Sequence, residues 1–307
     1  MKAPILNPIL SGAAVRYMAA LPLVGQRIAP VFNSNEMASA YYVYDTSNFT
    51  NVPTDIRRAP SSDFKRLKST LSSDTFLCKD YGIEEPMDKM ELRLYASVFN
   101  ADQAGMRRAV RVVALNHEIR VRNLARASTQ TSSPSVKWNA TSGTTIRADV
   151  QAAKNAIQAS IGIDPNLLTL PRDVYNALKY APELIELYKY SRDAVLTKTE
   201  IEKALDIEIA VANDLINVAN EGQAASLGAL WTDEAFFSYS VASQDPQELN
   251  WARTFNWTAA DGSGPLGIST FTYDQNEIDS RVVRARQFTD EKVVAAGAGY
   301  YLSNVLA

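Results

Sequence analysis

A long helical pattern between residues 88 and 127 is the feature that most constrains how this chain can fold. Met90, Leu94 and Val98 recur every four residues, and Asn100 or Asp102 then offers a cap or a break. A second apolar series follows at helical spacing, and it consists of Val110, Val113, His117, Val121 and Leu124. Spacings of three, four and seven residues place side chains on one helix face. The sequence therefore predicts a long helix with one apolar face.

The rest of this helix is basic. Glu118 interrupts the basic series and no aromatic residues interleave with it, so a solvated or subunit-facing surface is favoured over a nucleic-acid site. The arginines that we expect on this surface are Arg107, Arg108, Arg111, Arg120, Arg122 and Arg126.

A two-stranded β-excursion precedes the helix. Tyr41–Asp45 and Thr75–Tyr81 are rich in aromatic or alternating residues, as is typical of strands, and the residues between them show no clear period. A long ribbon with little core behind it is unstable alone, so the pattern predicts a partner surface; an ordinary mobile loop is the alternative. The predicted inter-subunit contacts are the basic residues of its tip, which are Arg57, Arg58, Lys65, Arg66 and Lys68.

The first 37 residues are apolar but broken by prolines, glycines and Arg16. The runs between charges are too short to span a bilayer, and a signal peptide would need a cleaner apolar stretch. The segment would make a poor core by itself, so we expect an arm that lies on a neighbouring subunit.

The remainder alternates helices with strands. Ile146–Ile161 has helical periodicity and Gly162 follows it as a stop, whereas 167–170 resembles a short buried strand. Pro171 is expected to start the next helix, and Thr197 or Thr199 to cap a later one. Strands are densest after residue 227, so the sequence predicts an α+β fold.

Residues that carry common chemistry are scarce. The chain has one histidine, His117, and one cysteine, Cys78, and it contains no phosphate-binding glycine loop. We therefore expect no catalytic residues, no cofactor, no metal site and no internal disulfide. The net charge of −3 argues against binding nucleic acid through bulk charge.

Several phrases, in this order, resemble the major capsid proteins of tailed double-stranded DNA phages, which have the HK97-type fold. Residues 58–60 and 75–81 resemble the two sides of the extended loop of that family, and 171–179 resembles its strand-to-helix phrase. Residues 205–211 resemble the strand that follows, and 284–302 the closing strands. The resemblance covers residues 30 to 304 and rests on the ordered set, since no single phrase is decisive.

The resemblance implies four parts. They are an N-terminal arm (1–37), an extended β-loop (38–84), a peripheral domain with a long spine helix (85–144 and 269–307) and an axial domain (145–268). No long charged region precedes residue 30, which implies a separate scaffolding protein.

The resemblance also implies a structural role and not an enzymatic one. The chain would self-assemble into hexamers and pentamers of an icosahedral phage head that encloses double-stranded DNA without reading its sequence. A portal and, in some heads, a decoration protein would be further partners, and no membrane is implied. The protein would be part of the virion, assembled in the host cytoplasm. The alternatives are an encapsulin-type cargo shell, a soluble α+β enzyme, and a tail or portal-adjacent structural protein.

Overall fold

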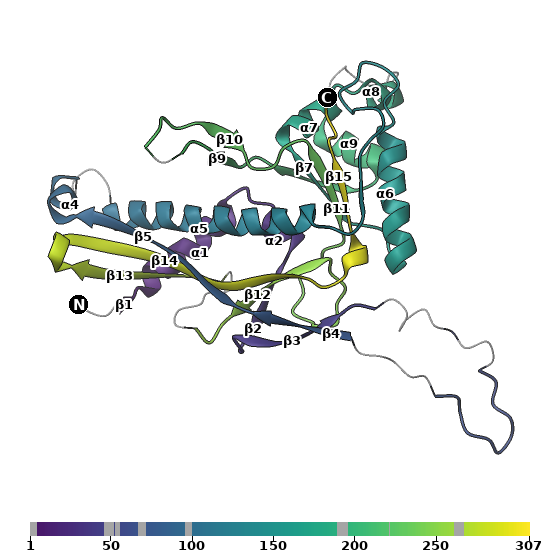
Figure 1. The fold of residues 1–307 in the computed structure, drawn as a ribbon, viewed down its shortest axis with the longest axis horizontal. Helices are drawn as coiled ribbons and strands as arrows, with labels where there is room; N and C mark the ends of the chain where they lie inside the picture. The colour runs from purple at the N-terminus through teal and green to yellow at the C-terminus, as the bar shows by residue number, and fades with distance from the viewer. Residues whose placement is uncertain are drawn as a thin grey trace.

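The computed structural model describes residues 5–45, 52, 56–66, 72–95, 100–188, 196–220, 222–260 and 267–307. In this part of the chain, one sheet runs alongside the long helix α5 (Ala101–Arg126), and a second sheet lies at the carboxyl end of that helix (Figure 1). Helices cover the second sheet, and a thin projection leaves the molecule from the lower edge of the first sheet as Figure 1 is drawn. The predicted α+β class is confirmed.

The predicted long helix consists of two helices, α4 (Lys89–Tyr95) and α5. The Asn100 side chain accepts a hydrogen bond from the backbone N–H of Gln103 at 3.2 Å, so Asn100 caps α5 as expected. Val110, Val113, His117 and Val121 are buried and Leu124 is half-buried, which confirms the predicted apolar face.

The first sheet has six strands among the described residues, and its longest strand pairs with three others. The strands are β1 (Ile5–Leu6), β13 (Ile268–Gln275), β14 (Ser280–Val293), β5 (Lys79–Asp88), β12 (Ala252–Trp257) and β2 (Val31–Ser34). β12 and β2 pair in parallel, and the other pairings of this sheet are antiparallel. Met106 and Val110 of α5 pack with Val283 and Ala285 of β14 to form the core beneath the helix.

The N-terminal segment packs on its own chain in described residues 5–37, and its expected contact with a neighbouring subunit stays a prediction. In α1 (Pro8–Ala20), Leu10, Ala14 and Met18 recur every four residues and are buried in the core formed by α5 and β14. The following turn, α2 (Gly25–Ile28), buries Ile28 completely. The prolines and glycines that break the segment separate these short elements and leave the apolar face of each free to pack.

The second sheet has five strands in the described part of the chain, in the order β6 (Thr131–Ser132), β15 (Gly299–Ser303), β11 (Glu234–Ser238), β7 (Leu167–Pro171) and β8 (Glu208–Ala212). The helices around it are α6 (Ile146–Ile161), α7 (Arg172–Lys179), α8 (Pro182–Tyr188) and α9 (Lys198–Leu205), and two one-turn helices, η1 (Asn276–Ile278) and η2 (Ala296–Ala298), precede β14 and β15. Gly162 ends α6 with a φ of 78°, as predicted. Pro171 ends β7 and occupies the N-cap position of α7, so this helix begins at Arg172, one residue later than expected; Thr197 forms a capping box with Glu200.

Strand pairing cuts across three of the boundaries that the resemblance implied. β12, expected in the axial domain, pairs with β14 in the first sheet, whereas β15, expected in the peripheral domain, pairs with β11 in the second. Residues 79–84, assigned to the extended loop, pair with β14 as part of β5. Each of the two domains that the resemblance implied therefore contributes strands to both sheets, so a division by sequence order does not describe this fold.

Two pairs of strands stand apart from the sheets. β3 (Ala38–Val43) and β4 (Ser72–Leu77) form the predicted antiparallel ribbon, and residues 56–66 lie beyond its end, far from the body of the molecule (Figure 1). β9 (Leu215–Asn217) and β10 (Leu227–Ala229) form a hairpin at the edge of the second sheet.

Candidate assembly surfaces

The amino-terminal half of α5 is joined to the first sheet by the core beneath it, and further along the helix Arg120 adds an ion pair to β14. The Arg120 guanidinium donates to both carboxylate oxygens of Glu291, at 2.7 and 2.9 Å, and lies over the ring of Tyr81 at 3.7 Å. Burial alone would raise the pKa of Glu291, but the hydrogen bonds from Arg120 and Thr289, together with the charges of His117 and Arg120, hold that pKa below its usual range. This bidentate contact fixes the orientation of the helix over the sheet.

Near its carboxyl end, α5 is joined to the second sheet by another buried carboxylate. Glu234 of β11 is 1% exposed and accepts hydrogen bonds from Arg122 at 2.9 Å, Arg126 at 2.7 Å and the Tyr301 hydroxyl at 2.7 Å. Burial, together with the hydrogen bond that the Tyr301 hydroxyl donates to Glu234, raises the pKa of Tyr301 to about 12. Arg108 pairs with Glu85 at 3.0 Å, so four of the arginines that we expected to be solvated or subunit-facing pair with carboxylates of their own chain.

His117 and Glu118 are the groups on α5 that could serve in acid–base catalysis, and both are fully buried. The Nε2 atom of His117 lies 3.0 Å from the Thr254 hydroxyl, and burial lowers its pKa to about 4. Burial raises the pKa of Glu118 to about 7, and its carboxylate accepts hydrogen bonds from the Gly25 N–H and the Trp231 indole. Both residues are at most 1% exposed, so no substrate can reach them, and they hold α2, α5 and the segment before β11 together.

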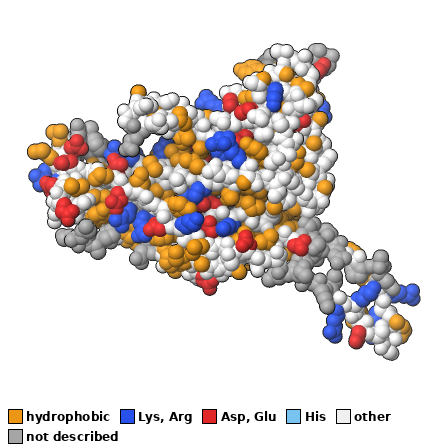
Figure 2. All heavy atoms as spheres, viewed as in Figure 1, with side chains coloured by type: hydrophobic (Ala, Val, Ile, Leu, Met, Phe, Trp, Pro, Cys, Tyr) orange, Lys and Arg blue, Asp and Glu red, His pale blue; other side chains and the backbone are white. Residues whose placement is uncertain are grey.

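The ribbon tip, residues 56–66, contains four of the five predicted contact residues. Arg57, Arg58, Lys65 and Arg66 are all exposed, and Lys68 lies outside the described residues. Phe64 is 70% exposed, with the Arg58 guanidinium 4.8 Å from its ring centre. Figure 2 shows the lysine and arginine side chains gathered at the far end of the projection, beside hydrophobic ones.

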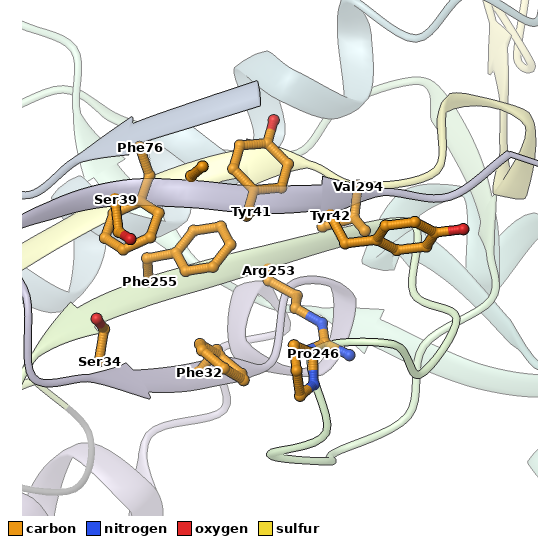
Figure 3. A pocket seen from close by; sticks show the side chains of 11 residues that line it. Phe32, Ser34, Ser39, Tyr41, Tyr42, Phe76, Pro246, Arg253, Phe255 and Val294 are labelled. Atoms are coloured by element: carbon orange, nitrogen blue, oxygen red, sulfur yellow. The ribbon is translucent and has the colours of Figure 1, made fainter. Parts of the chain in front are cut away.

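A pocket of about 200 Å³ lies at the base of the ribbon, between β2, β3, β4 and β12 (Figure 3). We call it the ribbon-base pocket. The Phe255 ring is central to it, stacked on Phe76 at 4.3 Å and at an edge to Phe32 at 5.6 Å. The residues that line it are Phe32, Ser34, Ser39, Ala40, Tyr41, Tyr42, Phe76, Pro246, Arg253, Phe255 and Val294.

Cys78 lies next to this pocket and is a buried thiol without a disulfide partner in the described chain. Its Sγ lies 3.6 Å from the Phe255 carbonyl oxygen, and burial raises the pKa of the thiol to about 12. A thiol that stays protonated and buried is chemically unreactive.

Two further surfaces are exposed. Opposite charges alternate across β5 and β14, where Arg286 pairs with Asp80 and Arg284 with Glu84. On the β9–β10 hairpin, Leu215 and Leu227 are 49% and 69% exposed. Sequence reasoning missed both surfaces, because the first depends on strand register and the second on a hairpin too short to show a period.

The described residues offer neither a metal site nor a membrane-spanning helix. Among them, no cluster of histidine, cysteine, aspartate or glutamate could hold a metal ion. No helix among them combines the length and the apolar character needed to cross a membrane.

Comparisons with known proteins agree with this geometry. The chain is 22% identical to the major capsid protein of Burkholderia phage BcepMu over 99% of its own length and 98% of that protein. The crystal structure of a phage-related protein from Bordetella bronchiseptica matches with a TM-score of 0.75 and 21% identity, covering 99% of this chain and 98% of that one. The capsid structure of cyanophage P-SCSP1u matches with a TM-score of 0.61 and 7% identity, covering 93% of this chain and 89% of that one. No family model matches the sequence.

The structural matches define the class: the chain has the α+β fold of phage capsid subunits, with which the HK97 type is consistent. The match to a curated relative over nearly the whole of both chains makes the assignment more specific. That relative is named a phage major capsid protein, and the match confirms the predicted resemblance to these proteins and the predicted structural, non-enzymatic role.

Proposed function

We propose that the chain assembles into the hexamers and pentamers of an icosahedral phage head that encloses double-stranded DNA. The observation that carries this proposal is the ribbon: its tip extends away from the body and exposes Phe64 and four basic side chains. A ribbon of two strands gains little stability from its own chain, so a neighbouring subunit is the natural surface for it.

Assembly would use many modest contacts. The ribbon tip, the β9–β10 hairpin and the charged face of β5 and β14 point to different sides of the subunit (Figure 1). Contacts between unlike surfaces close into rings when the rotation between subunits allows it. Repetition around a closed shell then makes weak pairwise contacts strong in sum. The charges on the ribbon tip would set the register between subunits more than the affinity.

The DNA would be confined and not read, because a chain with a net charge of −3 has no bulk attraction for phosphate. A separate scaffolding protein and a portal would complete the head, with a decoration protein in some heads, and assembly would take place in the host cytoplasm. Within the subunit, the first sheet with α5 would act as the peripheral domain, and the second sheet with α6 to α9 as the axial domain.

Electron microscopy of the full chain tests this proposal, with the chain expressed alone and together with the genes that neighbour it. Closed shells with five- and six-fold capsomers, filled with DNA when made during infection, are the expected result. A chain that stays monomeric in every condition, scaffold included, contradicts the proposal. Rings or open tubes would instead favour a tail or portal-adjacent protein, and shells that hold an enzyme and no DNA would favour a cargo shell.

A further inference from the structure

The ribbon-base pocket contains a buried positive charge whose hydrogen bonds are incomplete. Arg253 is 2% exposed, and its Nη2 donates to the Glu248 carbonyl at 2.7 Å, whereas its Nε–H has no hydrogen-bond partner. The ion pairs found among the described residues do not include Arg253, although Asp245 and Glu248 lie close enough to influence it. A buried cation without a paired anion is costly, so the site is suited to receive a carboxylate.

The rest of the pocket is suited to an aromatic ring. Phe32, Tyr41, Phe76 and Phe255 surround it, and Figure 3 shows Arg253 on one side of this aromatic group, next to Pro246. The volume is about 200 Å³, and an apolar cavity of roughly 150 Å³ is enough to hold benzene. The pocket therefore matches a ligand that carries an aromatic ring beside a carboxylate.

The ribbon tip of the same chain carries this combination. Asp63 and Phe64 are adjacent in sequence and both are exposed, Phe64 to 70%. Their basic neighbours Lys65 and Arg66 are exposed as well. Asp245, which is exposed, lies beside the pocket residue Pro246. Opposite charges would therefore meet at two places. Asp63 of the tip would face the buried Arg253, while the basic tip residues would face Asp245 at the rim of the pocket.

We propose that Phe64 of one copy of this chain enters the ribbon-base pocket of a second copy, where Asp63 pairs with Arg253. The tip cannot fill the pocket of its own chain, since it lies far from the base of its ribbon (Figure 1). The contact joins two different surfaces, head to tail, and so it can repeat around a ring. This inference rests on the proposed function and assigns the tip a defined receptor.

Disulfide trapping in the assembled shell tests the contact. Ser62→Cys combined with Pro246→Cys puts one thiol beside the tip pair and one at the pocket, and it leaves Asp63, Phe64 and Arg253 in place. Cys78 is buried and does not compete. Mild oxidation of shells should give a ladder of covalent multimers that ends at five and six copies. The matched control is Ser62→Cys with Ser135→Cys, an exposed position before Trp138, and it should give no ladder.

The two arms of the trapping experiment separate the inference from the function on which it rests. Shells that form but show no ladder, or show equal ladders in both variants, overturn the docking contact and leave the shell function intact. A chain that forms no shells in any condition overturns both.

The strength of the contact gives a second, independent readout. Phe64→Ala removes the ring and should raise the protein concentration needed for assembly on the order of ten- to a hundredfold, as expected for burial of one large apolar side chain. Ile56→Ala is the matched control, since Ile56 is a tip residue that is 74% exposed and has no place in the pocket. An equal effect of both substitutions, or no effect of either, contradicts the insertion of Phe64.

Discussion

The arginines of α5 and the basic residues of the ribbon tip meet opposite environments. On α5, Arg120, Arg122 and Arg126 reach carboxylates that are themselves buried in the two sheets. On the ribbon tip, Arg57, Arg58, Lys65 and Arg66 are exposed on a projection with no sheet behind it. The α5 arginines hold one subunit in shape, whereas the charged side chains of the tip face solvent.

The two groups of charges also differ in what they contribute to the stability of the chain. A short charged hydrogen bond fixes the orientation of a buried carboxylate, and loss of the partner lowers the stability of the fold because the charge is left buried and unpaired. An exposed charge contributes little to the stability of its own chain. Substitutions on α5 should therefore change folding, whereas substitutions at the tip should change assembly.

The largest effect is expected at Glu234. Glu234→Ala leaves Arg122, Arg126 and the Tyr301 hydroxyl without their common acceptor, and we expect the free energy of unfolding to fall by about 3 kcal/mol. This is the low end for a broken buried pair, because the Arg126 side chain is 40% exposed. Urea unfolding of unassembled protein measures the change.

Glu277→Ala is the control for Glu234, since Glu277 is an exposed residue of the one-turn helix before β14. It should change the free energy of unfolding by less than about 0.5 kcal/mol. A Glu234→Ala variant that is as stable as this control would mean that the ion pairs do not hold the second sheet to α5.

Local features of the fold were readable from the sequence, and the long-range ones were not. Periodicity predicts α5 and α6, because a helix depends on residues close together in the chain, and alternating residues predict the two strands of the ribbon. The burial of Glu118 was missed, because its partners Gly25 and Trp231 lie 93 and 113 residues away in sequence. An acid within a basic helical series is the one visible signal, and the sequence alone does not distinguish a buried acid from one on a surface.

The same limit applies to the candidate surfaces. The basic tip is visible in the sequence because its residues lie close together in the chain, but its contacts with other subunits stay a prediction. The ribbon-base pocket combines residues from positions 32 to 294, so no sequence window contains it. The N-terminal helix is not predicted for a related reason: its apolar face is short, and only its packing on α5 shows that the segment contributes to the core.

The next effect in size is a pH dependence that belongs to Glu118. Its pKa is raised from 4.5 to about 7, so between these values the folded chain keeps a proton that the unfolded chain releases. The free energy of unfolding therefore falls as the pH rises through this window. Compared with Glu118→Gln, which cannot titrate, the wild type should lose about 2 kcal/mol more between pH 5 and 7.

Urea unfolding of both proteins across this range provides the measurement, and the comparison removes other titrating groups. Asp214, with its pKa raised to about 6, acts in the same direction as Glu118. His117, with its pKa lowered to about 4, acts in the opposite direction. Both remain in the variant, so parallel curves for the two proteins would show that Glu118 does not titrate in this window.

A smaller effect is expected at the start of α5. Asn100→Ala removes the side-chain acceptor for the Gln103 N–H and should lower the free energy of unfolding by about 1 kcal/mol. Asn100→Ser keeps an acceptor at the cap and should recover most of the loss in the same urea titration. If the serine and alanine variants were equally unstable, the cap would not be the cause.

The smallest effect on folding, and the sharpest contrast with α5, is expected at the ribbon tip. Lys65→Glu with Arg66→Glu reverses two exposed charges, so the free energy of unfolding should stay within about 0.5 kcal/mol of the wild type. Assembly should weaken most at low salt, because charges that steer association are screened as ionic strength rises. Light scattering of shell formation from 50 to 500 mM salt, about a tenfold range, measures this.

Arg147→Glu with Lys203→Glu, an equal change of charge on exposed surfaces of the helices around the second sheet, is the control. Equal loss of assembly in both variants would mean that net charge, and not the ribbon tip, governs association.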